Sequence, residues 1–386
     1  MEWKEVRLGD VCNIITGFPF PGKKYSKEGI RVVRGDNVTI GNLRWDTEKD
    51  KRWNEPFDKT EYYSLQANDI VIGMDGSRVG KNKARIKEED LPLLLAQRVA
   101  CVRHNELAEQ DYLYYNIFSK KFIDYVNSIH TGSAIPHISQ KQIEDYKILL
   151  PNLETQRRIA SILSSLDRKI ELNNKINADL EEMAQAIFKN WFVDFEPFKG
   201  GKFVDSELGM IPEGWKVVKL GDFFPVKTGK KDANTASVNG KYPFFSCSQN
   251  ALCTDSYSFD CDAILVAGNG DFNVKWYSGK FDAYQRTYVL IPYNKKLLAL
   301  LYYVVKRNLL TITSKARGSV IRFITKGNLT DFEFAIPRDL ENNEIVDVFK
   351  SINEKIFANN KENSRLSLLR DTLLPRLMSG EIEVPE

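Results

Sequence analysis

The sequence is poor in the features that mark disulfide-linked, zinc-binding or membrane-spanning proteins. Its 386 residues include only five cysteines, and these form no CxxC pair, so neither a zinc site nor a disulfide framework is expected. No apolar run approaches the roughly 20 residues that cross a bilayer, and the N-terminus lacks a basic segment followed by an apolar one. We therefore expect a cytoplasmic protein with no membrane partner.

Motifs for catalysis are also missing from the sequence. It contains no GxxxxGK[ST] loop, no glycine-rich cofactor loop followed by a suitable acid, and no Asn/Asp-Pro-Pro-aromatic string. The first would serve a nucleotide-driven motor and the others an adenine methyltransferase. The histidines at positions 104, 130 and 137 lack the spacing of metal ligands. The sequence thus predicts no catalytic residue, no metal site and no cofactor in this chain.

The net charge of +3 is too small to indicate a nucleic-acid partner by itself. Basic residues are concentrated locally, because residues 284–330 contain nine Lys or Arg and no acid. A smaller basic cluster without an acid runs from Arg78 to Lys87. A solvated surface explains either cluster alone, but one cluster in each half of the chain favours two surfaces that face a polyanion.

The chain contains an internal repeat. Residues 132–188 align without a gap on residues 318–374, with 15 identities in 57 positions, where composition alone predicts about three or four. Upstream, three pairs of anchors follow in the same order: WKEVRLGDV and WKVVKLGDF, Thr16-Gly17 and Thr228-Gly229, and Gln97-Arg98 and Gln285-Arg286. The repeat predicts two copies of one unit, each a domain followed by a long helix.

Each repeated domain is expected to mix strands and helices. Short strand-like runs such as 69–73 and 263–267 are broken by Gly, Asn and Asp turns, and residues 111–126 have a helical pattern. We predict an α+β fold with two mixed α/β domains separated by two long helices. The expected limits are 1–151 for the first domain, 152–196 for the central helix, 197–337 for the second domain, and 338–386 for the C-terminal helix and tail.

Both long helices carry a heptad seam, in which the interior positions recur at alternating steps of four and three. Prolines at 151 and 197 frame the first helix, and prolines at 337 and 375 frame the second. Packing of each helix only on its own domain remains the alternative to a coiled coil. The first seam is Ile159, Leu163, Leu166, Ile170, Asn173, Asn177, Leu180, Ala184, Ile187 and Trp191; the second is Ile345, Phe349, Ile352, Ile356, Asn359, Asn363, Leu366, Arg370 and Leu373.

The matched asparagines in mid-seam argue for a pairing between the helices, because polar seam residues cost stability but select register. A pseudo-twofold axis that relates the two repeats would make the equivalent helices antiparallel. Buried polar groups seek partners. We therefore expect Asn173 beside Asn363 and Asn177 beside Asn359.

Four strings identify a family that the chain resembles: WKEVRLGD at residue 3, PNLETQRRIASIL at 151, FKNWFVDFEP at 188 and LLPRLMSGEI at 373. Their order and the duplicated layout resemble the specificity subunits of Type I restriction-modification systems. The resemblance implies a non-catalytic reader of double-stranded DNA whose two target-recognition domains bind the halves of an asymmetric bipartite site. The helices would act as the ruler between the halves.

The same resemblance implies partner subunits. These are two copies of an adenine-N6 methyltransferase that uses S-adenosylmethionine, and restriction subunits that translocate DNA with ATP and Mg²⁺. The cofactors would belong to the partners. Two alternatives stay open: an S-adenosylmethionine-dependent DNA methyltransferase, and a DNA-binding adaptor outside restriction.

Two equivalent loops, 131–137 and 316–322, are the first candidates for DNA contact, because they mix glycine with hydrogen-bond donors and glycine lets the backbone approach phosphate. A tight turn before a strand explains Gly132 and Gly318 equally well. Further basic residues complete the set. The candidate DNA-contacting residues are Lys23, Lys24, Arg78, Lys81, Arg98, Thr131, Gly132, Ser133, His137, Lys230, Lys231, Lys275, Arg286, Arg317, Gly318, Ser319 and Arg322.

Overall fold

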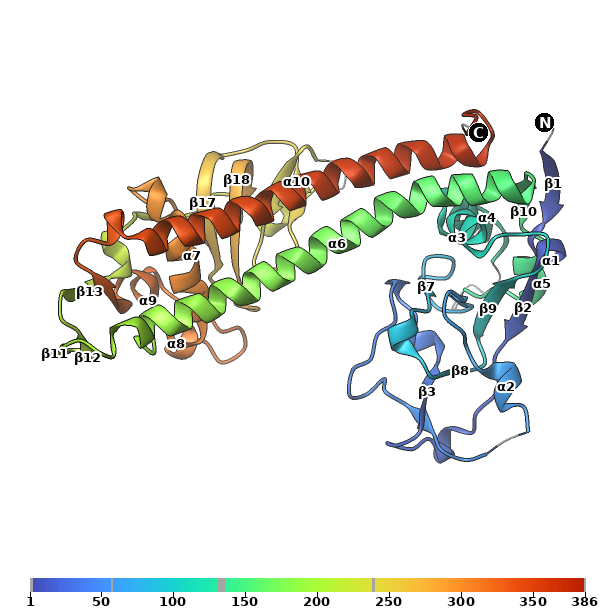
Figure 1. Cartoon of the computed structure of the whole chain (residues 1–386), viewed down its shortest axis with the longest axis horizontal. Helices are drawn as coiled ribbons and strands as arrows, with labels where there is room; N and C mark the ends of the chain where they lie inside the picture. Colours follow the sequence, from blue (N-terminus) through green and yellow to red (C-terminus); the bar gives the residue numbers. More distant parts are fainter. Residues whose placement is uncertain (1–2, 57, 131–135, 238–239, 385–386) are drawn as a thin grey trace. The chain divides into compact units, whose positions relative to one another are not determined.

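The computed structural model describes residues 3–56, 58–130, 136–237 and 240–384. The chain forms two compact units (Figure 1). Unit 1 comprises Met1–Glu171 and Asn363–Glu386, and unit 2 comprises Leu172–Glu362. Each unit therefore combines one domain that contains a β-sheet with half of each of two long helices, α6 (Leu153–Phe192) and α10 (Glu344–Met378).

Unit 1 is built on a five-stranded sheet in the order β2-β9-β6-β7-β4. A smaller sheet has the order β5-β3-β8, and β1 pairs with β10 antiparallel. The strands are β1 (Lys4–Arg7), β2 (Cys12–Thr16), β3 (Ile30–Val33), β4 (Ile40–Gly41), β5 (Arg52–Trp53), β6 (Ile70–Gly73), β7 (Lys83–Arg85), β8 (Leu93–Leu95), β9 (Val99–His104) and β10 (Lys147–Leu150). The helices are α1 (Leu8–Val11), α2 (Thr60–Tyr63), α3 (Gln110–Phe118), α4 (Lys120–Ile129) and α5 (Gln140–Glu144).

Unit 2 is built on a six-stranded sheet in the order β14-β19-β17-β18-β15-β16. Two antiparallel pairs, β11 with β12 and β13 with β20, complete it. The strands are β11 (Phe203–Ser206), β12 (Gly209–Pro212), β13 (Trp215–Lys219), β14 (Val226–Thr228), β15 (Tyr242–Phe245), β16 (Leu252–Thr254), β17 (Phe259–Ala267), β18 (Val274–Ala283), β19 (Thr287–Leu290) and β20 (Glu333–Pro337). The helices are α7 (Leu298–Arg307), α8 (Leu309–Ser314) and α9 (Lys326–Thr330).

The domain core in each unit extends onto the long helices. In unit 1, Tyr112 and Tyr115 on α3 pack with Ile159 and Leu163 on α6 and with Leu377 on α10. In unit 2, α7 lies against β17 and β18 (Figure 1), and its buried side chains share a cluster with the aromatic residues of both long helices. Burial of these apolar side chains fixes the helices onto the domains.

The predicted heptad seam is confirmed, because every seam position on both helices is buried or half-buried. The packing is antiparallel within each unit. In unit 2, Asn359 contacts Asn177, and the rings of Phe349 and Phe188 lie 6.3 Å apart. In unit 1, Arg370 pairs with Asp167 at 2.7 Å, and Leu377 further along α10 packs beside earlier residues of α6. The alternative in which each helix packs only on its own domain is therefore wrong.

Of the seam asparagines, Asn173 and Asn359 are buried, and Asn177 and Asn363 are half-buried. Asn359, which is 2% exposed, donates from Nδ2 to Asn177 Oδ1 at 2.8 Å, the pairing that the seam predicts. Asn173 donates to Glu362 Oε2 at 2.8 Å. Asn173 and Asn363 belong to different units, so their pairing stays a prediction.

Two predicted helix boundaries are wrong. Pro375 does not end the second helix, which continues to Met378. A proline in the last turn removes one hydrogen bond, while Leu374, Leu377 and Met378 still belong to the apolar cluster on which Trp3 packs. The helical pattern at 111–126 forms two helices, because the Ser119 hydroxyl accepts from the Phe122 amide and caps α4. Among the described residues, no helix combines length with enough apolar side chains to cross a membrane.

Candidate nucleic-acid interface

Loop segments meet at one end of the central sheet of unit 1. Because β2 and β6 both run antiparallel to β9, the ends of the first two lie beside its beginning. Backbone hydrogen bonds connect these strand ends to one another and to the segment 136–138. The bonds run from the amides of Gly17, Met74, Gly76 and Ile138 to the carbonyls of Val99 (3.2 Å), Arg98 (2.9 Å), Pro136 (3.0 Å) and Met74 (2.9 Å) respectively. We call this arrangement the loop junction of unit 1.

Unit 2 contains the same loop junction, bond for bond. The bonds run from the amides of Gly229, Gly268, Gly270 and Ile324 to the carbonyls of Thr287 (3.0 Å), Arg286 (2.8 Å), Arg322 (3.0 Å) and Gly268 (2.9 Å) respectively. The equivalences Arg98 with Arg286 and Asp75 with Asn269 follow from these bonds and from two bridges, Asp75 with His137 and Asn269 with Phe323. The internal repeat thus extends to the hydrogen bonding of the loops.

Close packing of backbone explains the Thr-Gly anchors. A Cβ atom on Gly17 would lie 2.2 Å from the Ala96 carbonyl oxygen, and one on Gly229 would lie 2.1 Å from the Ala283 oxygen. Only glycine fits these positions. Gly318 has φ +100°, and a Cβ there would lie 2.3 Å from the Ile321 oxygen, so the turn itself requires this glycine.

The junction of unit 1 borders a cleft lined by Thr16, Gln97, Arg98, His137 and Gln140, among others. Arg98 adopts φ +66°, which is uncommon for a residue with a side chain. Its Nη1 donates to Asp75 Oδ2 at 2.7 Å, while its side chain remains 70% exposed. An exposed ion pair contributes only about 0 to 1 kcal/mol. The guanidinium is therefore held in place without being sequestered from a ligand.

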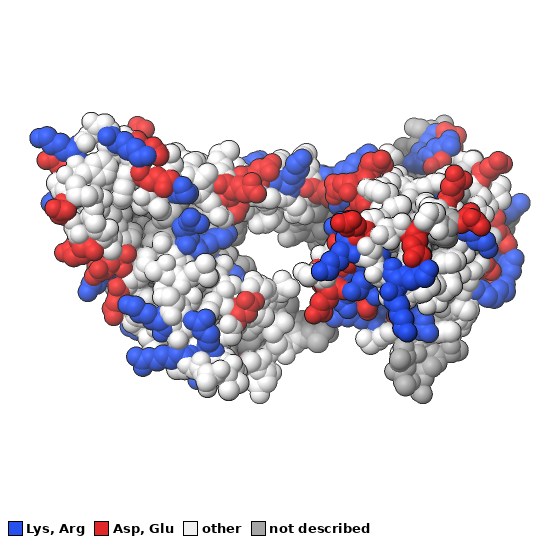
Figure 2. All heavy atoms as spheres, turned by 90° about the horizontal axis from the view of Figure 1, so that it is seen from below, with Lys and Arg blue, Asp and Glu red and all other residues white. Residues whose placement is uncertain are grey.

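The junction of unit 2 carries more uncompensated positive charge. Within the described part of the chain, the exposed Arg286 side chain has no ion-pair partner. Arg322 donates from Nη2 to the Thr313 carbonyl at 3.0 Å. Arg317, in the same loop, is exposed. On the face drawn in Figure 2, Lys and Arg side chains gather on the lower part of unit 2, at the left, with few acidic side chains among them.

Two other candidate lysines of unit 2 are tied to neighbours. Lys231 donates to Ser256 Oγ at 2.9 Å and lies 3.8 Å from the buried carboxylate of Asp282. Lys275 donates to the Ser248 carbonyl at 2.7 Å, and burial lowers its pKa. These contacts leave Lys230, which is exposed, as the freer of the adjacent pair.

The remaining candidates lie on exposed turns or outside the described residues. Lys23 and Lys24 occupy a short 3-10 turn, where Lys24 pairs with Glu55 at 2.8 Å. Arg78 and Lys81 are exposed between β6 and β7, and Ser319 is exposed in the 317–323 loop. Thr131, Gly132 and Ser133 lie outside the described residues.

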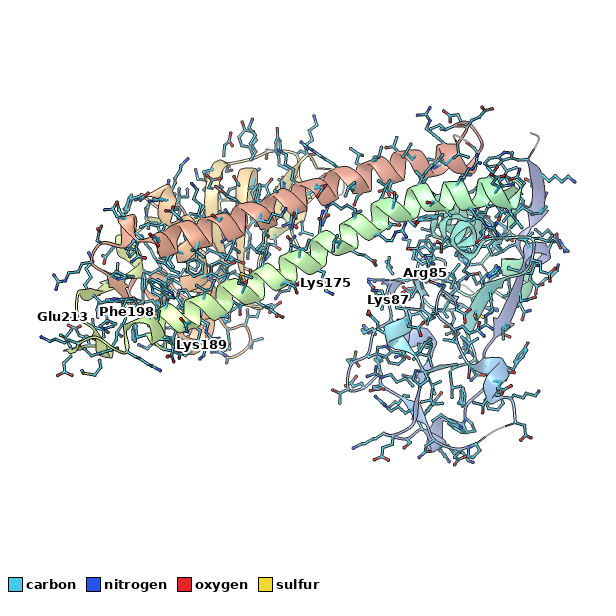
Figure 3. All side chains as sticks on the ribbon, in the orientation of Figure 1. Arg85, Lys87, Lys175, Lys189, Phe198 and Glu213 are labelled. Carbon is cyan, nitrogen blue, oxygen red and sulfur yellow. The ribbon has the colours of Figure 1, made fainter. Side chains whose placement is uncertain are left out.

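Two members of the basic cluster from Arg78 to Lys87, namely Lys83 and Arg85, are not free to face a polyanion. Lys83 is buried, donates to the Gly80 carbonyl at 3.0 Å, and lies over the rings of Phe118 and Phe122. Its burial lowers the pKa to about 7. Arg85 (Figure 3) pairs with Asp111. Both faces of β7 are covered, because Lys83 and its neighbour Ala84 point to opposite faces and are both buried, which a count of charges cannot reveal.

Sequence reasoning missed the uncharged members of the junctions, notably Gln97, Gln140 and Asn269. Gln140 donates from Nε2 to the Ile14 carbonyl at 3.0 Å and lies 3.4 Å from Thr16 Oγ1. The available signal was the pair Gln97-Arg98 and its copy Gln285-Arg286 at the same spacing from the helix that follows. That spacing indicated equivalent backbone positions.

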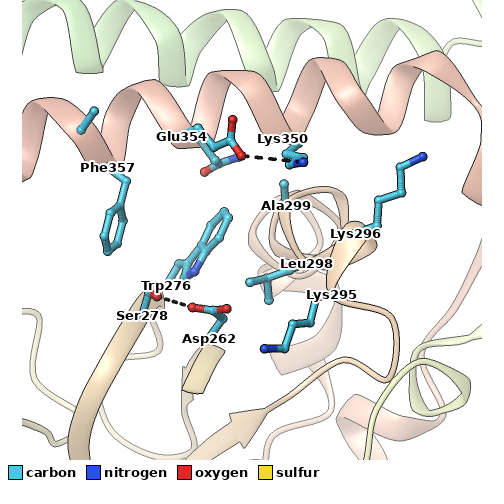
Figure 4. Close-up of a pocket in the computed structure, with 12 residues that line it drawn as sticks. Asp262, Trp276, Ser278, Lys295, Lys296, Leu298, Ala299, Lys350, Glu354 and Phe357 are labelled. Carbon is cyan, nitrogen blue, oxygen red and sulfur yellow. Dashed lines mark hydrogen bonds and ion pairs between the residues drawn. The ribbon is translucent and has the colours of Figure 1, made fainter. Parts of the chain in front are cut away.

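A separate cavity in unit 2 lies between β17, β18, α7 and α10 (Figure 4). Its apolar lining includes Trp276, Leu298 and Phe357. Some of the charged groups around it are paired with neighbours: Asp262 accepts from Ser278, and Lys350 lies 3.8 Å from Glu354. Across residues 3–56, 58–130, 136–237 and 240–384, no three His, Cys, Asp or Glu side chains are grouped to hold a metal ion.

Comparison with known proteins identifies relatives. The chain is 38% identical to the EcoDI specificity subunit of Escherichia coli over 45% of this chain and 40% of that protein. It is 30% identical to the MjaIX specificity subunit of Methanocaldococcus jannaschii over 72% and 70%, and 24% identical to the HindI specificity subunit of Haemophilus influenzae over 99% and 100%. The alignment thus spans less than half of the first relative and the full length of the third.

A solved structure has the same fold. The Type I restriction-modification S subunit from M. genitalium matches with a TM-score of 0.62 at 15% identity, over 98% of this chain and 96% of that chain. The sequence profile of the Type I restriction modification DNA specificity domain matches residues 1–182 and 212–368. The chain therefore belongs to the family of Type I restriction-modification specificity proteins.

Proposed function

We propose that this chain reads DNA as the specificity subunit of a Type I restriction-modification complex. The loop junction carries the proposal, because it occurs once in each unit with the same backbone bonds and presents an exposed arginine at the equivalent position, Arg98 or Arg286. Arginine is suited to phosphate and to bidentate contacts with guanine. Family membership supports the same function.

The proposed target is double-stranded DNA with an asymmetric bipartite site. The two junctions share backbone geometry but differ in side chains, with Asp75 and His137 in unit 1 and Asn269 and Phe323 in unit 2. Different donors and acceptors at equivalent places select different base edges. Phosphate contacts would come mainly from the basic candidates, which orient the domain without carrying sequence information.

The division of labour within the chain is part of the proposal. Residues 1–151 and 197–337 act as target-recognition domains, and the helical segments 152–196 and 338–386 set the spacing between half-sites. The seam residues Asn173, Asn177, Asn359 and Asn363 fix the helix register. Deletion of one heptad from both helices should change the gap between the recognised half-sites; an unchanged gap would contradict the ruler role.

The chain itself is proposed to be non-catalytic and to bind no cofactor. Two methyltransferase subunits would supply S-adenosylmethionine chemistry, and restriction subunits would use ATP and Mg²⁺. Calorimetric titration of the isolated chain with S-adenosylmethionine should give no binding heat. The complex co-purified with the methyltransferase should bind S-adenosylmethionine in the same titration. Saturable binding to the isolated chain would contradict this division and favour a methyltransferase.

DNA binding is tested by fluorescence anisotropy at several salt concentrations. Arg98→Ala and Arg286→Ala should each reduce the slope of log affinity against log salt by about one if the side chain contacts a phosphate. A larger loss with cognate DNA and an unchanged slope would instead indicate base reading. The control is Arg157→Ala, which removes from α6 an exposed arginine that pairs with Glu109. Unchanged affinity and slope in both junction variants would exclude the junctions from the interface.

A further inference from the structure

The 317–323 loop of unit 2 has a rigid base. The backbone amides and carbonyls of Arg317 and Phe323 bond to each other in both directions at 2.8 Å, which closes a tight hairpin. The base is fixed to the loop junction, because the Gly270 amide donates to the Arg322 carbonyl at 3.0 Å. The positive φ of Gly318 completes the turn. The loop is thus a preformed projection of the sheet domain.

The tip of this projection is apolar and uncovered. Val320 is 94% exposed and Ile321 is 59% exposed. Single exposed apolar residues are common, but these two are adjacent and lie at the end of a closed hairpin. Both are β-branched, so their side chains are stiff about χ1 and lose little conformational freedom when a partner encloses them. Their shape is suited to insertion into a narrow space.

The charge around the tip selects the kind of partner. Arg317 and Arg322 flank the apolar pair, and no acid occurs from residue 284 to residue 330. A concentration of basic side chains attracts a polyanion. A protein partner would need an acidic surface to gain from these charges, whereas DNA offers phosphates beside stacked, apolar base faces.

We propose that Val320 and Ile321 form an apolar wedge that inserts against one base-pair step of the DNA bound by unit 2. Arg317 and Arg322 would contact the phosphates on either side. Valine and isoleucine carry no donor or acceptor, so they cannot distinguish bases by hydrogen bonding. They would select steps that unstack easily, because wedge insertion costs a few kcal/mol that depends on the sequence deformed. This inference rests on the proposed DNA-reading function.

The test uses the chain assembled with its methyltransferase and a duplex that carries the recognised site. 2-Aminopurine is placed in turn at each adenine of the half-site except the one that is methylated, because a methyltransferase flips its target base out of the stack. Wild type should raise the fluorescence at one step, because unstacking relieves quenching. The double variant V320S/I321S should lose that rise and bind roughly tenfold more weakly, with an unchanged salt slope. Leu310→Ser, at an apolar position on α8 that is 85% exposed, is the matched control and should behave as wild type.

Several results would overturn the wedge while leaving DNA reading intact. One is the absence of a fluorescence rise in wild type when Arg317→Ala still lowers the salt slope. Another is a loss of affinity in V320S/I321S that is not accompanied by any change in stacking and that replacement of thymine by uracil in the duplex reproduces. That result would indicate contact with a thymine methyl group. Failure of V320S/I321S to co-purify with the methyltransferase would assign the tip to protein binding. Failure of wild type to bind the duplex would overturn the proposed function itself.

Discussion

The two units place different chemistry on the same backbone positions. In unit 1 the carboxylate of Asp69, 2% exposed, accepts from Arg103 Nη2 at 2.6 Å and Nε at 2.8 Å. The strand pairings and the junction bonds make Ala263 and Ile291 the equivalents in unit 2. An ion pair with a buried carboxylate in one unit is therefore an apolar pair in the other.

The neighbouring strand repeats the contrast. Lys83 pairs with Ile72 across β6 and β7, and the equivalent register in unit 2 places Val274 opposite Val266. Two residues further along the same strand, Arg85 of unit 1 is replaced by Trp276 in unit 2. The comparison teaches that the repeat preserves backbone hydrogen bonds and helix seams, while the side chains of the sheet have diverged.

The largest expected effect comes from breaking the ion pair of unit 1. Asp69→Ala should destabilise unit 1 by about 3 to 5 kcal/mol, because it leaves Arg103 partly buried without its partner. The double change D69A/R103I, which copies unit 2, should recover most of that loss. Native-state hydrogen exchange of β6 and β9 amides measures both. Equal destabilisation by the single and double changes would show that the two sheets are not equivalent.

Lys83 should make the stability of unit 1 depend on pH. Its pKa in the folded chain is about 7, below its ordinary value of 10.5, because of burial. The unfolded chain binds more protons between these values, so this group makes the free energy of unfolding rise with pH at up to about 1.4 kcal/mol per unit. The stability gain is complete above pH 10.5 and absent below pH 7.

The matched change is Lys83→Val, which copies Val274 of unit 2. The difference in hydrogen-exchange free energy between wild type and this variant should vary across pH 7 to 10.5, the interval between the two pKa values, since other titrating groups cancel. The variant should be the more stable at the lower end of that interval. Parallel pH profiles for the two proteins would contradict burial of a titrating lysine.

The smallest expected effect concerns the helices that both units share. N177L/N359L should raise stability by about 1 kcal/mol while loosening helix register, because a polar pair specifies alignment at a cost in stability. The melting temperature gives the first effect, and disulfide formation between cysteines placed at Asp167 and Arg370 gives the second. Lys175→Leu, at an exposed position of α6, is the control. A drop in melting temperature for the pair, but not for the control, would contradict the account.

The long helices could be predicted closely from the sequence, because a heptad period is a local property that packing then satisfies. The end of α10 could not, since the last turn joins an apolar cluster that also includes Trp3, far away in the sequence, and the helix continues past Pro375. Burial of Lys83 depends on packing against both faces of β7, which the local sequence does not reveal. The loop junctions rest on hydrogen bonds between segments far apart in the chain, so the sequence indicated their anchors but not their geometry.

Long-read sequencing of methylated adenines in host DNA, with and without this gene, tests the central claim most directly. The account predicts one asymmetric bipartite motif, with an unread gap, that is methylated in the parent and unmethylated after deletion. Restoring the gene should restore the motif. An unchanged set of methylated motifs would contradict the claim that this chain reads DNA for a methyltransferase.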